Sequence, residues 1–271
     1  MKPELFNNLK IVSAERNMLW SLCPFHKDGS RANLSISLHG KYLGRYKCWA
    51  CGKEGWLTPS QKQHLDLESK KKYKQYALID WTSLLRKYIL SYCKNNINPP
   101  FNVNDFVLEQ LNCGWDNVYT FPFRNEKNEV IGIQLRYPDG KKRCIEGSKL
   151  GLFIPQGVDW IKQNIILICE GVSDTAVALD MGFNAVGLPS ATAGHEIIIS
   201  WLLKNTSHDC RYLIISDRDD AGINSSKKLI REWNKLYGDM YYTVTERADL
   251  REWVQIDGKE HVRKGLSRYE I

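Results

Sequence analysis

Apolar runs and amphipathic runs follow one another through the second half of the chain. Short apolar runs predict buried strands near residues 165–169, 184–187, 211–216 and 240–244. The amphipathic runs that follow them predict helices near residues 172–182, 194–204, 221–237 and 249–256. Because strands and helices alternate, we expect a mostly parallel sheet with helices on both faces. Region 161–271 is therefore predicted to be an α/β domain.

The middle of the chain combines a helical period with short alternating segments. Apolar residues recur at helical spacing from Trp81 to Tyr92 and predict a helix that ends before Pro99. A second short helix is predicted over residues 103–111. The alternating segments predict strands over residues 118–123, 130–137 and 142–145. Region 77–160 is thus expected to hold helices followed by a mixed, basic strand subdomain, which makes the chain α+β overall.

Two closely spaced pairs of metal-ligand residues lie near the amino terminus. Cys23 and His26 are separated by two residues, as are Cys48 and Cys51, and 21 residues lie between the pairs. Each short turn presents two nitrogen or sulfur ligands, and two such turns can close a tetrahedron around Zn²⁺. Four such residues rarely coincide by chance at both spacings. The sequence therefore predicts one structural zinc site.

The residues around these ligands set the predicted limits of the zinc domain. Residues 33–38 and 42–49 predict two short strands joined through Gly40, and with the ligand pairs they indicate a zinc ribbon over residues 1–57. The following segment, 58–76, is polar and rich in lysine. We interpret it as a linker that lets the zinc domain move.

Acidic residues follow two of the predicted strands. Asp217 and Asp219 lie one residue apart after strand 211–216, so an extended backbone places both carboxylates on one face. Close carboxylates repel each other unless a cation such as Mg²⁺ lies between them. A capped strand-to-helix turn stays open as the alternative, because Asp also favours turns and N-caps. Glu170 ends strand 165–169, and ligands bind outside the carboxyl ends of such strands, so we expect three acids to share one crevice.

Charge is distributed unevenly along the 271 residues. Residues 1–100 carry 17 Lys and Arg against 7 Asp and Glu, whereas residues 151–271 carry 14 against 17. The basic amino-terminal region suits binding of a polyanion such as nucleic acid, and the acidic carboxyl-terminal region suits metal-ion catalysis. From charge alone, a solvated lysine-rich face explains the basic amino-terminal region at least as well as nucleic-acid binding does.

The composition limits the class of protein. A hydrophobic content of 43% and a charged content of 25% are ordinary for a folded protein, and the length accommodates two modest domains. No apolar run is long enough to span a bilayer, and the amino terminus lacks a signal-peptide core. We therefore expect a cytoplasmic location and no membrane partner. The cysteines outside the predicted zinc site are scattered, which agrees with a reducing compartment.

Region 161–271 contains the motifs Ile168-Cys-Glu-Gly-Val-Ser-Asp-Thr-Ala176, Gly187-Leu-Pro-Ser190 and Ile215-Ser-Asp-Arg-Asp-Asp-Ala-Gly222. Together they resemble the Toprim domain shared by DnaG-type primases, phage primases, topoisomerases and some nucleases. The resemblance implies that Glu170, Asp217 and Asp219 bind one or two catalytic Mg²⁺ or Mn²⁺ ions. The segment Ala248-Asp-Leu-Arg-Glu-Trp253 resembles the later Lys-Asp-x-x-Asp/Glu segment of phage primases and implies a fourth catalytic acid, Asp249. Ala248 stands where that segment commonly has Lys.

Further segments resemble other parts of the same primases. Cys23-Pro-Phe-His-Lys-Asp-Gly29 and Tyr46-Lys-Cys-Trp-Ala-Cys-Gly-Lys-Glu-Gly55 resemble the amino-terminal zinc-binding domain of DnaG-type primases, which selects the template site. Residues 121–124, 131–136 and 152–155 resemble the amino-terminal half of the primase core. That half contributes basic residues to template and nucleotide, which implies such a role for Arg136, Lys141, Lys142, Arg143 and Lys149. Ordinary exposed hairpin charges are the alternative for about half of them.

The resemblances together imply a DNA primase that joins nucleoside triphosphates into short RNA primers on single-stranded DNA. In that reaction Glu170 either binds a metal ion or acts as general base on the attacking hydroxyl. Because the chain has no room for the helicase or helicase-binding domain of those primases, we expect a phage, plasmid or mobile-element protein that works with a separate replicative helicase. Two alternatives remain: a Toprim-type nuclease that uses the same acids with water, and a non-catalytic nucleic-acid-binding replication protein.

Overall fold

The structure is a computed structural model that describes residues 9, 11–15, 18–27, 32–38, 40–59, 61, 79–95, 100–237 and 240–269. The chain divides into two compact units, Met1–Ile79 and Asp80–Ile271. Most of the predicted linker, residues 60 and 62–76, lies outside the described residues. In the described part of the chain, no helix is both long and apolar enough to cross a membrane.

The first unit contains an antiparallel sheet of short strands in chain order. They are β1 (Ile11–Glu15), β2 (Met18–Ser21), β3 (Leu34–Ser37), β4 (Arg45–Cys48) and β5 (Glu54–Trp56). Leu19, Leu34 and Ile36 are fully buried and form the centre of a small core. So small a core usually needs a metal or a covalent link to hold it. The two predicted strands are confirmed as β3 and β4, whereas β1, β2 and β5 were not predicted.

The second unit opens with two capped helices. The helix α2 (Trp81–Lys94) follows Asp80, whose side chain accepts a hydrogen bond from the backbone N–H three residues later at 3.0 Å. The helix α3 (Asp105–Gln110) follows Asn104, which accepts the equivalent bond, also at 3.0 Å. Each cap satisfies a donor that the first turn leaves free. Both predicted helices of this region are confirmed.

A second antiparallel sheet follows these helices. Its strands lie in the order β6 (Gly114–Trp115), β7 (Tyr119–Arg124), β8 (Val130–Arg136) and β9 (Lys142–Cys144). Leu85 and Tyr88 of α2 pack on Ile133 of β8 and cover one side of the sheet. The three predicted strands of this region are confirmed. The two-residue strand β6 was too short to predict.

The last third of the chain forms a parallel sheet, as predicted. Its strands lie in the order β11 (Ala185–Leu188), β10 (Ile165–Glu170), β12 (Arg211–Ser216) and β13 (Met240–Val244), and every neighbouring pair is parallel. In the register of β10 and β12, Cys169 pairs with Ile215. Glu170 and Ser216 are therefore level, and the residues that follow both strands emerge at the same edge.

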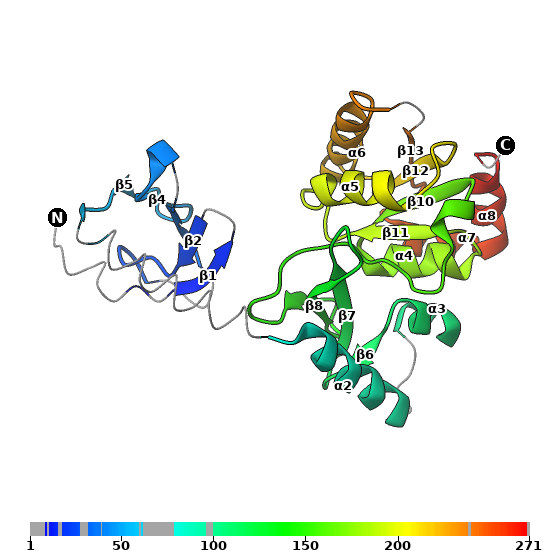
Figure 1. The fold of residues 1–271 in the computed structure, drawn as a ribbon, viewed down its shortest axis with the longest axis horizontal. Coiled ribbons are helices and arrows are strands. Elements are labelled where there is room, and N and C mark those ends of the chain that lie inside the picture. The colour runs from blue at the N-terminus through cyan, green and yellow to red at the C-terminus, as the bar shows by residue number, and fades with distance from the viewer. Residues whose placement is uncertain are drawn as a thin grey trace. The chain divides into compact units, whose positions relative to one another are not determined.

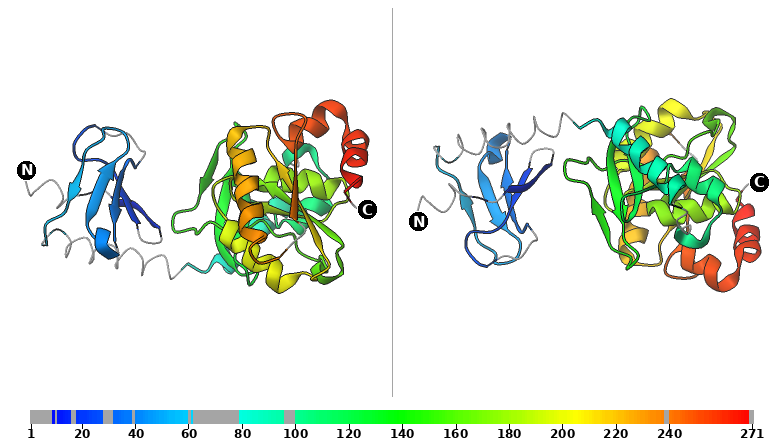
Figure 2. Two further views of the ribbon diagram at one scale, coloured as in Figure 1. Left: turned by 90° about the horizontal axis from the view of Figure 1, so that it is seen from above. Right: turned by 90° about the horizontal axis from the view of Figure 1, so that it is seen from below.

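Helices cover both faces of the parallel sheet (Figure 1, Figure 2). On one face lie α5 (His195–Asn205) and α6 (Asp220–Trp233), which pack on Ile166 and Ile168 of β10. Leu167 and Cys169 point to the other face, which is covered by α4 (Gly171–Asp180), α7 (Leu250–Asp257) and α8 (Lys259–Ser267). Strand alternation thus separates two hydrophobic cores. The helix α8 was not predicted.

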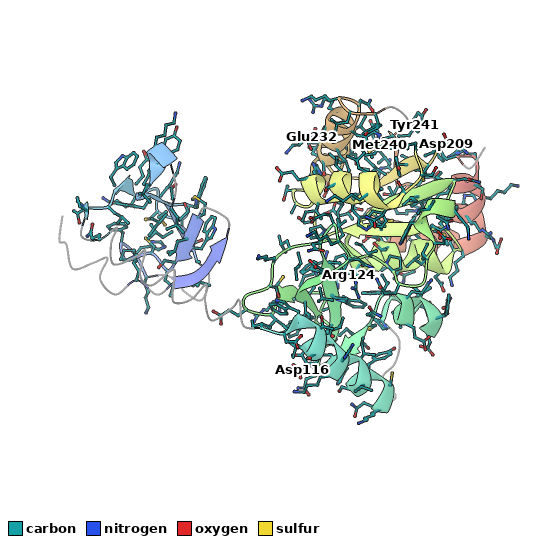
Figure 3. The ribbon with its side chains drawn as sticks, in the orientation of Figure 1. Asp116, Arg124, Asp209, Glu232, Met240 and Tyr241 are labelled. Atoms are coloured by element: carbon teal, nitrogen blue, oxygen red, sulfur yellow. The ribbon has the colours of Figure 1, made fainter. Side chains whose placement is uncertain are left out.

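The segment 152–153 joins the two sheets of the second unit. Arg124, at the end of β7, donates its backbone N–H to Leu152 at 2.9 Å, and Phe153 donates to Gly187 of β11 at 2.9 Å. Figure 3 shows Arg124 between the antiparallel strands and the parallel sheet. A Cβ on Gly151 would lie 2.4 Å from the Arg124 carbonyl oxygen, so this close junction requires glycine. The junction fixes β8 and β9 beside the carboxyl edge of the parallel sheet.

Candidate active site and zinc centre

Cys23, His26, Cys48 and Cys51 form one cluster on the first unit. Their ligand atoms all lie within 4.8 Å of one another, and the Cys23 and Cys51 Sγ atoms are 3.8 Å apart. Two sulfurs bound at about 2.3 Å to a tetrahedral ion also lie about 3.8 Å apart, so the spacing fits Zn²⁺. Among the residues that the structure describes, no other group of His, Cys, Asp and Glu has such a ligand spacing.

Backbone amides of two tight turns point at these thiols. The Phe25 N–H donates to Cys23 Sγ and the Cys51 N–H donates to Cys48 Sγ, each at 3.4 Å. Burial opposes ionisation of Cys48, but the amide donors lower its pKa below the ordinary value. Burial raises the pKa of Cys23 to about 12. The full set of thiolates therefore forms only together with a cation.

The outward face of β4 and β5 carries exposed aromatic rings beside cations. Arg45 and Lys47 occupy exposed positions of β4. The Lys47 Nζ lies 5.0 Å from the centre of the Trp49 ring, which is 65% exposed. The Arg45 guanidinium lies 5.9 Å from the centre of the Tyr42 ring, and Arg45 pairs across the sheet with exposed Trp56. Such a surface suits stacked bases and backbone phosphates.

Five carboxylates gather at the carboxyl edge of the parallel sheet. Glu170 ends β10 and Asp217 follows β12, while Asp219 and Asp249 are the residues before α6 and α7. Asp174 lies in the first turn of α4. The charge on each of the other four acts on Asp217. The structure thus brings the four predicted acids together and adds Asp174. We call these five residues the acid cluster.

Burial and crowding raise the pKa values of three carboxyls in the acid cluster. Burial, followed by the charges of the four neighbours, raises the pKa of Asp217 to about 8. Burial and the charge of Asp249 raise the pKa of Asp174 to about 7. Burial also raises the pKa of Glu170, against a backbone N–H from Ala191 that lowers it. Carboxyls of this kind hold protons until a cation arrives to replace them.

Asp219 and Asp249 also cap helices. Asp219 Oδ1 accepts a hydrogen bond from the Gly222 N–H at 2.6 Å, and Asp249 Oδ1 accepts one from the Glu252 N–H at 2.7 Å. The capped turn that the sequence left open as an alternative therefore exists together with the acid cluster. Each cap fixes one carboxylate oxygen and thereby the direction of the other.

Gly222 lets α6 begin directly against the end of β12. A Cβ on this residue would lie 2.9 Å from the Asp217 carbonyl oxygen and 3.2 Å from the Asp217 Cβ. The first of these contacts is shorter than backbone atoms tolerate, so a larger residue would displace the first turn of α6. The spacing of Asp217 and Asp219 therefore depends on this glycine.

Three cations lie among the carboxylates. The Arg251 guanidinium is 3.1 Å from Asp249 Oδ2, and its backbone N–H donates to Asp174 at 3.0 Å. Burial lowers the pKa of Arg136, which is 6% exposed, while the charges of the same two acids oppose that shift. Lys142 lowers the pKa of Asp174. When all groups are ionised, five carboxylates and three cations leave two negative charges that one divalent ion would balance.

The remaining predicted basic residues have other surroundings. The Lys141 Nζ forms an ion pair with Asp139 Oδ2 at 2.5 Å in the turn before β9. The Arg143 guanidinium lies 5.7 Å from the centre of the Tyr137 ring in the same hairpin. Strand alternation places Arg143 on the opposite face of β9 from Lys142. Lys149 has an exposed side chain in the segment after β9. Of the five predicted basic residues, the structure places Arg136 and Lys142 within electrostatic reach of the acid cluster.

Asp174 and Arg251 were not among the predicted site residues. Asp174 lies near the start of the predicted helix 172–182, which directly follows the strand that ends with Glu170, so it belongs to the same edge of the predicted sheet. That signal was present in the sequence. Arg251 gives no such signal, because its backbone contact with Asp174 joins residues 77 positions apart.

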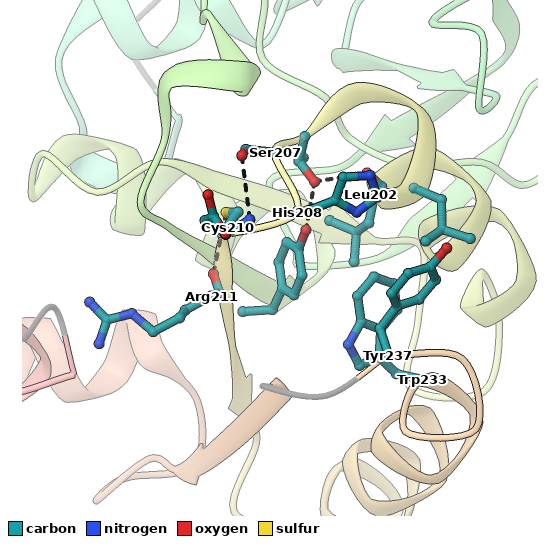
Figure 4. A pocket seen from close by; sticks show the side chains of 11 residues that line it. Leu202, Ser207, His208, Cys210, Arg211, Trp233 and Tyr237 are labelled. Carbon is teal, nitrogen blue, oxygen red and sulfur yellow. Dashed lines mark hydrogen bonds between the residues drawn. The ribbon is translucent and has the colours of Figure 1, made fainter.

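A cavity of about 350 Å³ lies at the opposite edge of the parallel sheet (Figure 4). Its lining includes His208, Trp233 and Tyr237, together with Arg211, the first residue of β12. None of the residues of the acid cluster lines it. The cavity and the acid cluster are therefore separate places on the same sheet.

Comparisons with known proteins establish the fold. No protein-family model matches the chain, and no curated protein sequence matches it significantly. The chain nevertheless has the fold of the zinc-binding and RNA polymerase domains of DnaG-type primases.

The primase of Aquifex aeolicus, solved with its zinc-binding and RNA polymerase domains, is 18% identical with a TM-score of 0.55, over 95% of this chain and 79% of that one. A DnaG primase catalytic domain bound to single-stranded DNA is 16% identical with a TM-score of 0.53, over 74% of this chain and 82% of that one. A DNA primase domain from Pseudomonas aeruginosa is 14% identical with a TM-score of 0.52, over 72% of this chain and 78% of that one.

Proposed function

We propose that the protein is a DNA primase that joins nucleoside triphosphates into short primers on single-stranded DNA. The observation that carries this proposal is the acid cluster, which lies beside Arg136 and Lys142 within a primase fold. Carboxylates suit divalent ions, and the adjacent cations suit phosphates. A solved DnaG catalytic domain of the same fold binds single-stranded DNA, which supports this choice of template.

Glu170, Asp217 and Asp219 would hold Mg²⁺ or Mn²⁺. The oxygen ligands are the type that these ions prefer, and their open arrangement suits Mg²⁺, which keeps waters and substrate phosphates among its ligands. When bound, the ion supplies Lewis-acid stabilisation to the α-phosphate and the attacking hydroxyl. Asp174 and Asp249 would adjust the charge around this position.

The chain's own side chains would then orient the substrates. The 3′-hydroxyl of one nucleotide attacks the α-phosphate of the next, and a P–O bond forms as pyrophosphate leaves. Glu170, whose pKa is raised by burial, has a second candidate role: in place of binding the ion, it would take the hydroxyl proton as general base. Arg136 and Lys142 would bind the triphosphate and stabilise the leaving pyrophosphate.

The first unit would select the template. The four ligands of the zinc cluster would hold one Zn²⁺, and the exposed rings of Trp49, Tyr42 and Trp56 would stack on unpaired bases. We also propose the division into a zinc ribbon (1–57), linker (58–76), basic strand subdomain (77–160) and Toprim-type domain (161–271). A separate replicative helicase and a phage, plasmid or mobile-element origin remain parts of this proposal, and stimulation of priming by a helicase of the same replicon tests them.

The direct test is primer synthesis on single-stranded DNA with labelled nucleotides and Mg²⁺ or Mn²⁺. Native protein should make labelled short oligomers, and Asp217→Ala should not. Asp209→Ala is the matched control, because Asp209 is exposed and lines the cavity at the opposite edge of the sheet. Shortened DNA without labelled oligomers would identify a nuclease instead. Template binding without either product would identify a non-catalytic binding protein.

A further inference from the structure

The segment 245–248 connects β13 to α7 and runs beside the end of β12. In the parallel register of these strands, Ser216 of β12 pairs with Val244 of β13. The Thr245 N–H continues this ladder by donating to the Ser216 carbonyl at 3.1 Å. Asp249, the residue before α7, directly follows the segment. The place of Asp249 in the acid cluster therefore depends on where this segment lies.

Arg218, which stands between the two acids that follow β12, binds this segment twice. Its backbone N–H donates to the Ala248 carbonyl at 3.0 Å. Its Nη1 donates to the Glu246 carbonyl at 2.6 Å. One residue thus ties the end of β12 to the residue immediately before Asp249.

The charge of Arg218 is directed at a carbonyl and not at a carboxylate. In the described part of the chain, Arg251 and Arg247 form ion pairs with carboxylates at 3.1 and 2.9 Å, whereas Arg218 forms none. A hydrogen bond from a charged donor is stronger than one between neutral groups, so the contact with Glu246 is a firm one. Asp217 and Asp219 are left to a divalent ion.

The other contacts of residues 246–248 do not reach β12. The Arg247 guanidinium pairs with Asp257, and the Ala248 N–H donates to Glu252 at 2.9 Å, both within α7. The Arg247 carbonyl accepts the Thr245 hydroxyl at 2.8 Å, inside the segment itself. Among the described hydrogen bonds, those between residues 246–248 and the end of β12 are therefore both made by Arg218.

We propose that Arg218 is a positioning residue that holds Asp249 beside the divalent ion bound by Asp217 and Asp219. Its backbone N–H fixes the residue before Asp249, and its side chain keeps the preceding turn from moving away at Glu246. The proposal rests on the proposed function, since it assigns these carboxylates to a divalent ion.

A positioning role and a simple charge effect predict opposite changes in metal affinity. If Arg218 only contributed positive charge near the acid cluster, its removal would strengthen the binding of a divalent ion. If Arg218 holds Asp249 in place, its removal lets that carboxylate move away from the ion, and binding weakens. The sign of the change therefore distinguishes the two roles.

Mn²⁺ binding to the whole protein, measured by calorimetric titration, tests this without any turnover. Arg218→Ala should weaken Mn²⁺ binding about fivefold, the effect of one lost hydrogen bond. Arg218→Lys keeps a charged donor for the single bond to Glu246 and should restore binding to within about twofold. Arg231→Ala is the matched control, because that guanidinium donates to the Lys227 carbonyl at 3.2 Å within α6, and it should bind Mn²⁺ as the native protein does.

A double variant shows whether Arg218 acts through Asp249. Asp249→Asn should itself weaken Mn²⁺ binding, because it removes one negative charge. Adding Arg218→Ala to Asp249→Asn should change the affinity by less than about twofold, because the charge that Arg218 positions is already gone. A general loss of stability would instead lower the affinity equally in both backgrounds.

The outcomes separate the two proposals. Unchanged or tighter Mn²⁺ binding by Arg218→Ala, no rescue by Arg218→Lys, or an equal loss in the Asp249→Asn background would each overturn the positioning role. A native protein that binds no Mn²⁺ would overturn it as well. Because the titrations are independent of nucleotide joining, a native protein that makes no primers would refute the proposed function and leave the titrations to decide on Arg218.

Discussion

The zinc cluster and the acid cluster gather their ligands in opposite ways. The zinc ligands come from two tight turns close together in the sequence, and their atoms already lie within 4.8 Å of one another. The acids come from the ends of two parallel strands and the beginnings of three helices. Long-range packing brings them to one edge, and three cations lie among them.

This difference separates a metal that holds a fold from a metal that serves a reaction. Four soft ligands at closed spacing complete a tetrahedron and leave no position for a substrate. Carboxylates with raised pKa values and open spacing bind an ion while leaving positions for water and phosphate. Under the proposed function, the chain thus carries a structural metal site on its first unit and a catalytic metal site on its second.

The largest effect is expected when the zinc cluster loses one of its ligands. We expect Cys48→Ser to lose zinc and to unfold the first unit, because metal binding contributes about 10 kcal/mol or more to the folding of small zinc modules. Zinc content measured by mass spectrometry and far-ultraviolet circular dichroism would report this change. Cys93→Ser, at an exposed cysteine of the second unit, should keep its zinc. A Cys48→Ser protein with full zinc content would contradict the assignment.

When divalent ions are absent, raising the pH should destabilise the second unit through the acid cluster. The pKa values of Asp174 and Asp217 in the folded protein, about 7 and about 8, lie above the ordinary 3.8. Their protonated forms therefore stabilise the fold fully below about pH 4, and this contribution is lost as the pH rises to 8. We expect the melting temperature of the second unit to fall on the order of 5 °C between pH 5 and pH 8.

Two comparisons decide whether the acid cluster causes that fall. Asp217→Asn should show a smaller fall by calorimetry, because it removes one of the titrating carboxyls. Saturating Mg²⁺ should also reduce the fall, because the ion binds the ionised form. An equal fall in native protein and Asp217→Asn would show that other groups are responsible.

Removing the guanidinium of Arg251 from the acid cluster should strengthen binding of a divalent ion and weaken binding of nucleotides. We expect Arg251→Leu to bind Mn²⁺ about tenfold more tightly, because the acid cluster gains one unbalanced negative charge. The KM for nucleoside triphosphates should rise for the same reason. Arg247→Leu is the matched control, since that guanidinium pairs with Asp257 at 2.9 Å. Weaker Mn²⁺ binding by Arg251→Leu, measured by calorimetric titration, would refute this balance of charges.

The smallest effect is expected on the surface beside the zinc cluster. Trp49→Ala should weaken binding of single-stranded DNA about fivefold, the lower end of what one stacked base contributes. Zinc content should stay unchanged because the ring is 65% exposed. Leu43→Ala, which removes an exposed side chain without a ring, should bind DNA normally in fluorescence anisotropy. Equal affinity in the two variants would remove Trp49 from the template surface.

Local patterns in the sequence predicted the elements whose side chains are buried in regular order. The continuous apolar run around Ile166 and Leu167 predicted a buried strand, and the parallel sheet followed from the helices between such strands. The strand β6 and the helix α8 escaped prediction for different reasons. Two residues are too few to show alternation, and α8 buries only Val262 and Leu266 in an otherwise polar run.

The candidate site was predictable where its residues follow strands and not where distant segments meet. The sequence predicted Asp217 and Asp219 because they lie one residue apart after a strand, and it predicted Glu170 because that residue ends a buried strand. The contact of Arg251 with Asp174, and that of Arg218 with Glu246, join segments far apart in the sequence, which no local spacing encodes. The structure was also needed to show that Lys142 and Arg143, adjacent in the sequence, face different surroundings.

The glycine at the start of α6 gives a way to separate assembly from chemistry. Gly222→Ala would retain every carboxylate, every cation and every zinc ligand, yet the added methyl group would push the helix away from the strand end and spread the pair that follows β12. Under the proposed function, we expect a protein altered in this way to bind template and nucleotides but not to join them. It is therefore the natural starting point for trapping the fully loaded complex.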